Sequence, residues 1–103
     1  MVSLDKLLTE CVQQNGSYLH IKAGRPPILR LQPSQLMEMA MPPLSPEEAR
    51  AICYQALTVE QRAQFEQTLE INASYEVAGL GVFEVNLFKA RGHVCGVFHF
   101  TRG

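Results

Sequence analysis

The residues with the clearest potential for metal chemistry lie near the end of the chain, in the stretch HVCGVFHF. His93, Cys95 and His99 are two and four positions apart, so on a β-strand they would share one face of the sheet. Zinc holds its ligands at about 2.0–2.3 Å. A strand advances about 3.3 Å per residue, so His93 and His99 would stand about 20 Å apart. Only two ligands could share an ion, and we expect no metal site, although His20 could lie on the same sheet.

A cysteine nucleophile requires a thiolate beside a general base and an oxyanion pocket. Cys11 and Cys53 lie on the apolar stripes of two predicted helices, which indicates core packing. Cys95 beside His93 is the only remaining candidate, and we expect no cysteine catalysis. The odd number of cysteines and their wide spacing are typical of reduced thiols in the cytoplasm.

Two glycine-containing stretches, AGLG and KARG, could in principle bind phosphate through backbone amides. Both lie between predicted strands, where glycine serves a hairpin turn that needs positive φ. The Walker-type pattern G-x-x-x-x-G-K-[ST] does not occur in the sequence. We therefore expect no catalysis by this chain and no cofactor bound to it.

One acidic residue stands apart from the others. Five glutamates are explained by helix caps and solvated faces: Glu47, Glu48, Glu60, Glu66 and Glu76. Glu84 instead lies within the predicted strand VFEVNLF, where Val82, Asn86 and Phe88 share its face. A face that mixes apolar residues with an acid and an amide is typical of contact with another protein, and simple solvent exposure is the alternative.

The elements that position these residues follow from hydrophobic periodicity. The segment SLDKLLTECVQQNG has the apolar stripe of a helix, and Ser45 and Thr58 each open a capping box that predicts a further helix. Strands are predicted at SYLHIK, ILRL, EINASYEV, VFEVNLF and HVCGVFHF, whereas LMEMAM is either a strand or a helical turn. We expect one α+β domain over residues 1–103, with a mostly antiparallel sheet of five to six strands and helices packed on one face.

Composition excludes several classes of partner. The formal net charge is -1 and the basic residues do not cluster, so nucleic acid and anionic membranes are poor partners. The first helix carries Asp5, Lys6 and Glu10, which is unlike a secretory signal. No run approaches the roughly 20 apolar residues of a membrane span, so we expect no direct membrane insertion.

The order and sequence of these elements resemble the N-terminal domain of the PilT family, which are hexameric motor ATPases that retract type IV pili and are related to secretion ATPases. Three stretches carry the resemblance: LDKLLTECVQQNGSYLHIKAGRPPILRL, PPLSPEEARAICYQALTVEQRAQFE and LEINASYEVAGLGVFEVNLFKARGHVCGVF. The last is similar to the family pattern E-x-D-x-S-Y-x-x-x-G-x-G-R-F-R-V-N-x-F-x-Q-R-G. The resemblance covers essentially the whole chain and implies a PAS-like fold.

The resemblance also implies a role. In the family this domain packs on the ATPase domain of a neighbouring subunit, and its basic residues help to close the nucleotide cleft. It implies a non-catalytic domain of a twitching-motility ATPase, at the inner face of a bacterial pilus or secretion machine. Subunit packing would fall on the mixed face of VFEVNLF and on Arg25 and Arg30, and Arg91 would lie nearest the nucleotide. ATP and magnesium are implied only for the ATPase domain, which this sequence lacks.

Departures from the family pattern are informative. Tyr18 stands where the family usually has aspartate, and Val82 and Glu84 stand where it usually has two arginines. Glu84 reverses a charge that could face phosphate, which argues against help with hydrolysis. Because the family chain continues into a catalytic domain, the resemblance implies either a piece of a longer ATPase or a free-standing relative.

Two other functions remain open from the sequence. A free-standing adaptor or regulator that docks on a pilus or secretion ATPase is favoured by the lost arginines. A PAS-like sensor of small ligands is the other, with Met37, Met39 and Met41 as a soft lining. Against the sensor, every apolar stripe is already needed for the core.

Overall fold

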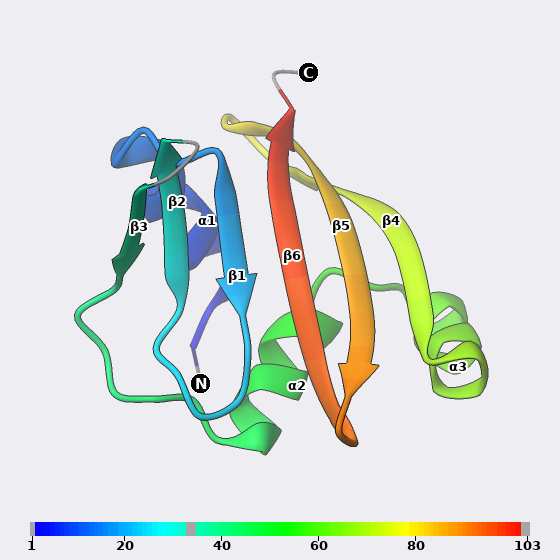
Figure 1. Cartoon of the computed structure of the whole chain (residues 1–103). Helices are drawn as coiled ribbons and strands as arrows, with labels where there is room; N and C mark the ends of the chain where they lie inside the picture. Colours follow the sequence, from blue (N-terminus) through cyan, green and yellow to red (C-terminus); the bar gives the residue numbers. More distant parts are fainter. Residues whose placement is uncertain (1, 33–34, 102–103) are drawn as a thin grey trace.

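The computed structural model describes residues 2–32 and 35–101, and these form an α+β domain of three helices and six strands (Figure 1). In chain order the elements are α1 (Leu4–Gln13), β1 (Tyr18–Ile21), β2 (Ile28–Gln32), β3 (Gln35–Glu38), α2 (Pro46–Tyr54), α3 (Val59–Thr68), β4 (Glu70–Val77), β5 (Gly81–Ala90) and β6 (His93–Thr101). The expected fold class is confirmed, and the ambiguous segment LMEMAM contributes a short strand rather than a helical turn.

The sheet consists of two three-stranded meanders joined edge to edge. Its strand order is β3-β2-β1-β6-β5-β4, and every pair of neighbours is antiparallel. Hairpins connect the strands within each meander, and α2 and α3 connect one meander to the other. The two meanders meet where β1 pairs with β6, with Leu19 opposite Phe98 and Ile21 opposite Gly96. We call this junction the seam.

The helices begin where their capping residues predict. Ser45 accepts a hydrogen bond from the amide of Glu48, and the Glu48 side chain accepts one from the amide of Ser45. Thr58 and Gln61 form the equivalent box at the start of α3. Each box satisfies two backbone donors that the first turn of a helix leaves free. No helix among the described residues has the length and apolar character that crossing a membrane requires.

The core lies between the helices and one face of the sheet (Figure 1). Phe83 and Phe98 contribute fully buried rings from β5 and β6, and Met39 is buried in the same cluster. Cys11 and Cys53 are buried too, and burial raises the pKa of Cys11 to about 11 and that of Cys53 to about 12. Both thiols stay protonated near neutral pH, so the expected core role of these two cysteines is confirmed.

Candidate interface on the outer face of the sheet

The face of the sheet that points away from the core carries the candidate site, and we call it the outer face. Figure 1 shows α1 and α2 behind the sheet and α3 beside β4, so that no described helix crosses the outer face. Along β6 the buried residues Val94 and Phe98 point inward, and Val97 and His99 point outward. Strand alternation therefore places a mixed set of side chains on a face without a helical layer.

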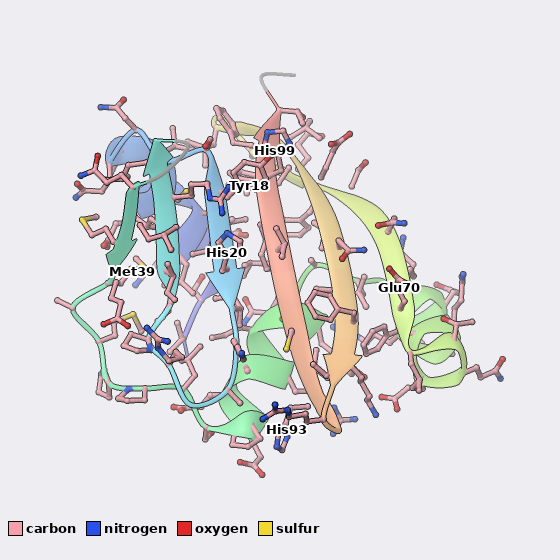
Figure 2. The ribbon with its side chains drawn as sticks, viewed as in Figure 1. Tyr18, His20, Met39, Glu70, His93 and His99 are labelled. Carbon is pink, nitrogen blue, oxygen red and sulfur yellow. The ribbon has the colours of Figure 1, made fainter. Side chains whose placement is uncertain are left out.

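Four outward residues form a continuous row across the seam. The pairing register sets Arg30 opposite Tyr18, Tyr18 opposite His99, and His99 opposite Glu84. We call this set the central row: Arg30, Tyr18, His99 and Glu84. Figure 2 shows Tyr18 and His99 together at one end of the sheet, with His20 beside them on β1. The row places a cation on β2 and a carboxylate on β5, on opposite sides of the seam.

Neighbouring members of the central row contact one another. The Arg30 guanidinium carbon lies 5.7 Å from the centroid of the Tyr18 ring. The Tyr18 and His99 rings stack with centroids 4.3 Å apart and planes 9° apart. His99 Nδ1 lies 3.7 Å from Glu84 Oε1, and the Glu84 side chain remains 70% exposed. A contact this open adds little to stability, so the Glu84 end of the row remains available to a partner.

A shallow hollow of about 550 Å³ opens on the outer face beside the central row. Tyr18, Asn72, Glu84 and Asn86 are among the residues that line it. Asn86 Nδ2 donates a hydrogen bond of 2.7 Å to Asn72 Oδ1, which links β5 to β4 across the floor of the hollow. The lining mixes polar and aromatic side chains with apolar ones such as Val97, which is the composition of ordinary protein-contact surface.

His20 lies on the outer face next to the central row, and one of its ring nitrogens lacks a hydrogen-bond partner within the described part of the chain. Among the described residues no group bonds its Nε2, although that atom is buried. Burial, and to a lesser degree the charge of Arg30, lowers the pKa of His20 below its ordinary value near 6.5. The imidazole is therefore neutral at neutral pH.

This environment predicts a pH dependence of stability. Because the folded-state pKa of His20 is lower than the unfolded value, the unfolded chain binds more protons between the two, so stability falls as the pH drops through that window. In chemical unfolding followed by circular dichroism, the free energy of unfolding should fall from about pH 7.5 to about pH 5.5. The His20→Gln variant should show a shallower fall over the same range. Equal slopes in the two proteins would contradict this assignment.

The strand residues expected at an interface do share the outer face. Glu84 is exposed, and Val82, Asn86 and Phe88 are half-buried at alternate positions of β5. Arg30 joins them through the central row. Their placement agrees with the sequence-based expectation, and whether they contact a partner stays a prediction.

Two arginines from the sequence analysis lie elsewhere. Arg25 follows β1 in the connection to β2, and its guanidinium makes a 2.6 Å ion pair with Glu38 at the end of β3. Arg91 and Gly92 form the tight turn between β5 and β6, with φ of 55° and 81°. Arg91 is exposed there, seven residues and about 23 Å along the hairpin from Glu84. The structure therefore does not bring Arg91 and the central row together.

Sequence reasoning missed the pairing of Tyr18 with His99. Strand alternation predicts that each residue lies on the polar face of its strand. It does not predict that the two distant strands pair in the register that stacks the two rings. The structure also separates the residues first considered for metal binding. Cys95 is buried, whereas His93 is exposed beside the far turn, away from His99 (Figure 2). No group of three metal-ligating side chains occurs within residues 2–32 and 35–101.

Comparison with known proteins places this fold. No protein-family model matches the chain. The chain is 33% identical over 97 residues to the type IV pilus retraction ATPase PilT of Pseudomonas aeruginosa, and the match covers 94% of this chain and 28% of that protein. It is 33% identical over 93 residues to the type IV pilus ATPase PilU of the same organism, covering 90% of this chain and 24% of PilU. The chain thus spans about a quarter of the length of these relatives.

Solved structures show the same architecture. The crystal structure of the pilus retraction motor PilT with bound ADP superposes with a TM-score of 0.86 at 25% identity, over 96% of this chain and 29% of that one. The ATPase DotB of Legionella pneumophila superposes with a TM-score of 0.76 at 19% identity, over 94% of this chain and 28% of that one. The second likeness shows a shared fold.

Proposed function

The chain is a homologue of the N-terminal region of the PilT-family ATPases, and from this premise we propose that it is a non-catalytic packing domain of a type IV pilus or secretion ATPase. Its outer face binds an ATPase domain, either of the same subunit or of a neighbour in a hexameric ring. Through that contact the domain transmits motion between subunits at the cytoplasmic side of a pilus or secretion machine.

The observation that carries this proposal is the uncovered outer face. Val82 and Phe88 are only half-buried there, on the same face of β5 as the exposed side chain of Glu84. Interfaces that form and separate repeatedly mix apolar and charged side chains in this way, because their apolar fraction is close to that of ordinary protein surface. The core-facing side of the same sheet is filled by the helices and offers no comparable surface.

The first test is the state of the protein in its own cells. An antibody against this domain should recover a species several times heavier than 11.5 kDa that includes a Walker-type ATPase segment identified by mass spectrometry. A species of 11.5 kDa that copurifies with a separate ATPase of this type would instead support an adaptor. Recovery of the small species with no such ATPase would overturn both versions.

The second test locates the contact. Ser74 is exposed on the outer face of β4, and Glu60 is exposed on α3. A photo-crosslinking residue at position 74 should attach to the ATPase domain, and the same residue at position 60 should not. The reverse pattern would assign the contact to the helical side of the domain.

Arg91 is the residue that we propose lies nearest the nucleotide. In the assembled ATPase, Arg91→Glu should lower the rate of ATP hydrolysis while leaving assembly intact, because it places a negative charge near phosphate. Lys89→Glu is the matched control, since Lys89 is an exposed cation on the same hairpin and the charge change is identical. Equal hydrolysis rates in the wild type and the Arg91→Glu assembly would remove Arg91 from the nucleotide site.

One observation favours the adaptor as a second candidate. Val82 and Glu84 stand where the family resemblance leads one to expect two arginines, and the exposed carboxylate of Glu84 would repel phosphate. A domain released from catalysis has no need for those arginines. The native-mass experiment distinguishes the two candidates.

A further inference from the structure

The charges of the outer face are arranged so that they complement a second copy of the same face. The central row crosses four neighbouring strands in the order β2, β1, β6 and β5. Neighbouring strands lie about 4.8 Å apart, so Arg30 and Glu84 stand at equal distances of about 7 Å on opposite sides of the seam. The row is therefore positive at one end, aromatic in the middle and negative at the other end.

We propose that the outer face binds a second copy of this chain about a two-fold axis that runs along the seam. Such an axis runs parallel to the strands, midway between the two sheets. It places β1 of one copy opposite β6 of the other, and β2 opposite β5. Arg30 then faces the second copy's Glu84, and Tyr18 faces the second copy's His99. The symmetry creates two identical arginine–glutamate pairs.

The next row of outward residues tolerates this arrangement. The register that aligns the central row also sets Ile28, His20, Val97 and Asn86 side by side in the next row. Under the same axis His20 faces the second copy's Val97, and Ile28 faces the second copy's Asn86. Farther out, Glu38 faces the second copy's Asn72. None of these pairs opposes like charges, which would weaken the association.

The Arg30 guanidinium has no acidic partner within the described part of the chain, which favours a partner that brings a carboxylate to Arg30. Among the described residues no group bonds the buried Nε of Arg30, and none forms an ion pair with its guanidinium. The nearest basic side chain to Glu84 is His99, whose Nδ1 lies 3.7 Å from Glu84 Oε1, which is beyond hydrogen-bonding distance. The second copy's Glu84 would supply a carboxylate for the terminal nitrogens of the Arg30 guanidinium, which have no ion-pair partner among the described residues.

A second copy fits better than a uniformly charged partner. An acidic surface would satisfy Arg30 but would oppose Glu84, and a basic surface would do the reverse. The fitting partner carries the same charges in reversed order across the same spacing, as this face does after a two-fold rotation. The inference goes beyond the proposed function, because it gives the outer face a second, mutually exclusive partner: the paired domains cannot bind an ATPase domain through the same face.

The test is sedimentation of the purified chain over a range of concentrations, which reports the dissociation constant of the dimer. Interfaces of standard size, about 800 Å² per partner, can be as weak as micromolar, and for this face we expect a constant on the order of 10–100 µM. Arg30→Glu and Glu84→Arg should each weaken the dimer at least about tenfold, because each places two pairs of like charges in contact. The double variant should recover most of the lost affinity, since both members of every pair have exchanged charge.

Matched controls separate this result from general charge effects. Lys6→Glu on α1 and Glu60→Arg on α3 make the same charge changes at exposed helical sites, and both should leave the constant unchanged. Circular dichroism checks that every variant is folded, and Arg30→Gln with Glu84→Gln replace any reversal that unfolds the chain. These neutral variants should each weaken the dimer by a smaller factor.

A monomer at all concentrations, a dimer insensitive to the reversals, or a double variant as weak as the singles would each overturn the inference. The outcome is independent of the proposed function. Failure to dimerise leaves the crosslink from position 74 to an ATPase domain intact, and loss of that crosslink leaves the dimer intact.

Discussion

Replacing Phe65 with alanine is expected to lower the free energy of unfolding by about 3–5 kcal/mol, the range for a buried phenylalanine. Phe65 is 0% exposed. In α3, which is described along its whole length, it is the one buried residue. Its ring meets the Tyr54 ring edge-on, with centroids 6.0 Å apart and planes at 88°. One side chain therefore attaches the helix to the core.

The other contacts of α3 cannot compensate for this loss. Arg62 donates two hydrogen bonds, of 3.1 and 2.8 Å, to the backbone carbonyl of Tyr54. Arg50 and Glu66 form an ion pair of 3.2 Å between α2 and α3, with both side chains about half exposed. Exposed polar contacts contribute little, because water competes for the same groups. The helix is therefore expected to detach when its one buried side chain is truncated.

Urea unfolding followed by far-ultraviolet circular dichroism is the appropriate measurement, since the chain contains no tryptophan. Gln67→Ala is the matched control, because Gln67 is exposed on the same helix and its loss should change stability by less than about 0.5 kcal/mol. Phe65→Leu should cost less than Phe65→Ala, because it keeps part of the buried volume. If Phe65→Ala and Gln67→Ala were equally stable, α3 would be attached by its surface contacts instead.

The local elements of this fold could be predicted from the sequence because their signals are local. Ser45 with Glu48, and Thr58 with Gln61, lie three residues apart and satisfy each other's backbone groups without help from the rest of the chain. The alternation in EINASYEV and VFEVNLF likewise specifies which side chains reach the core. For this reason the shared face of Val82, Glu84, Asn86 and Phe88 followed from strand periodicity alone.

The central row could not be predicted in the same way. It depends on β1 pairing with β6, two strands from opposite ends of the chain, and register across such a pair is set by the packing of both meanders. A shift of one residue would have moved Tyr18 out of contact with His99. Arg25 and Arg91 illustrate a different limit. Both lie close in sequence to strand residues, but both belong to connections between strands and not to the outer face.

The seam also contains the residue with the second large expected effect. Gly96 lies on β6 opposite Ile21 of β1 and Leu87 of β5, and its Cα faces Cys53 of α2. A Cβ atom at this position would lie 2.8 Å from Cys53 Sγ and 2.9 Å from Leu87 Cδ2. Contacts this short force either the strand or the helix to move. We expect Gly96→Ala to lower the free energy of unfolding by about 1–3 kcal/mol, and Gly96→Val to lower it further.

The sign of this prediction is informative, because alanine usually stabilises a strand relative to glycine by restricting the unfolded chain. Destabilisation would therefore measure the steric conflict rather than strand propensity. Combining Gly96→Ala with Cys53→Ala should recover part of the loss, because the second change removes the sulfur that the new methyl group meets. A coupling of about 0.5–3 kcal/mol in this double-mutant cycle is expected for residues in contact. If the two changes in unfolding free energy were strictly additive, Cys53 would not be the residue through which α2 packs on the seam. Other contacts would then have to hold the helix close to the strand.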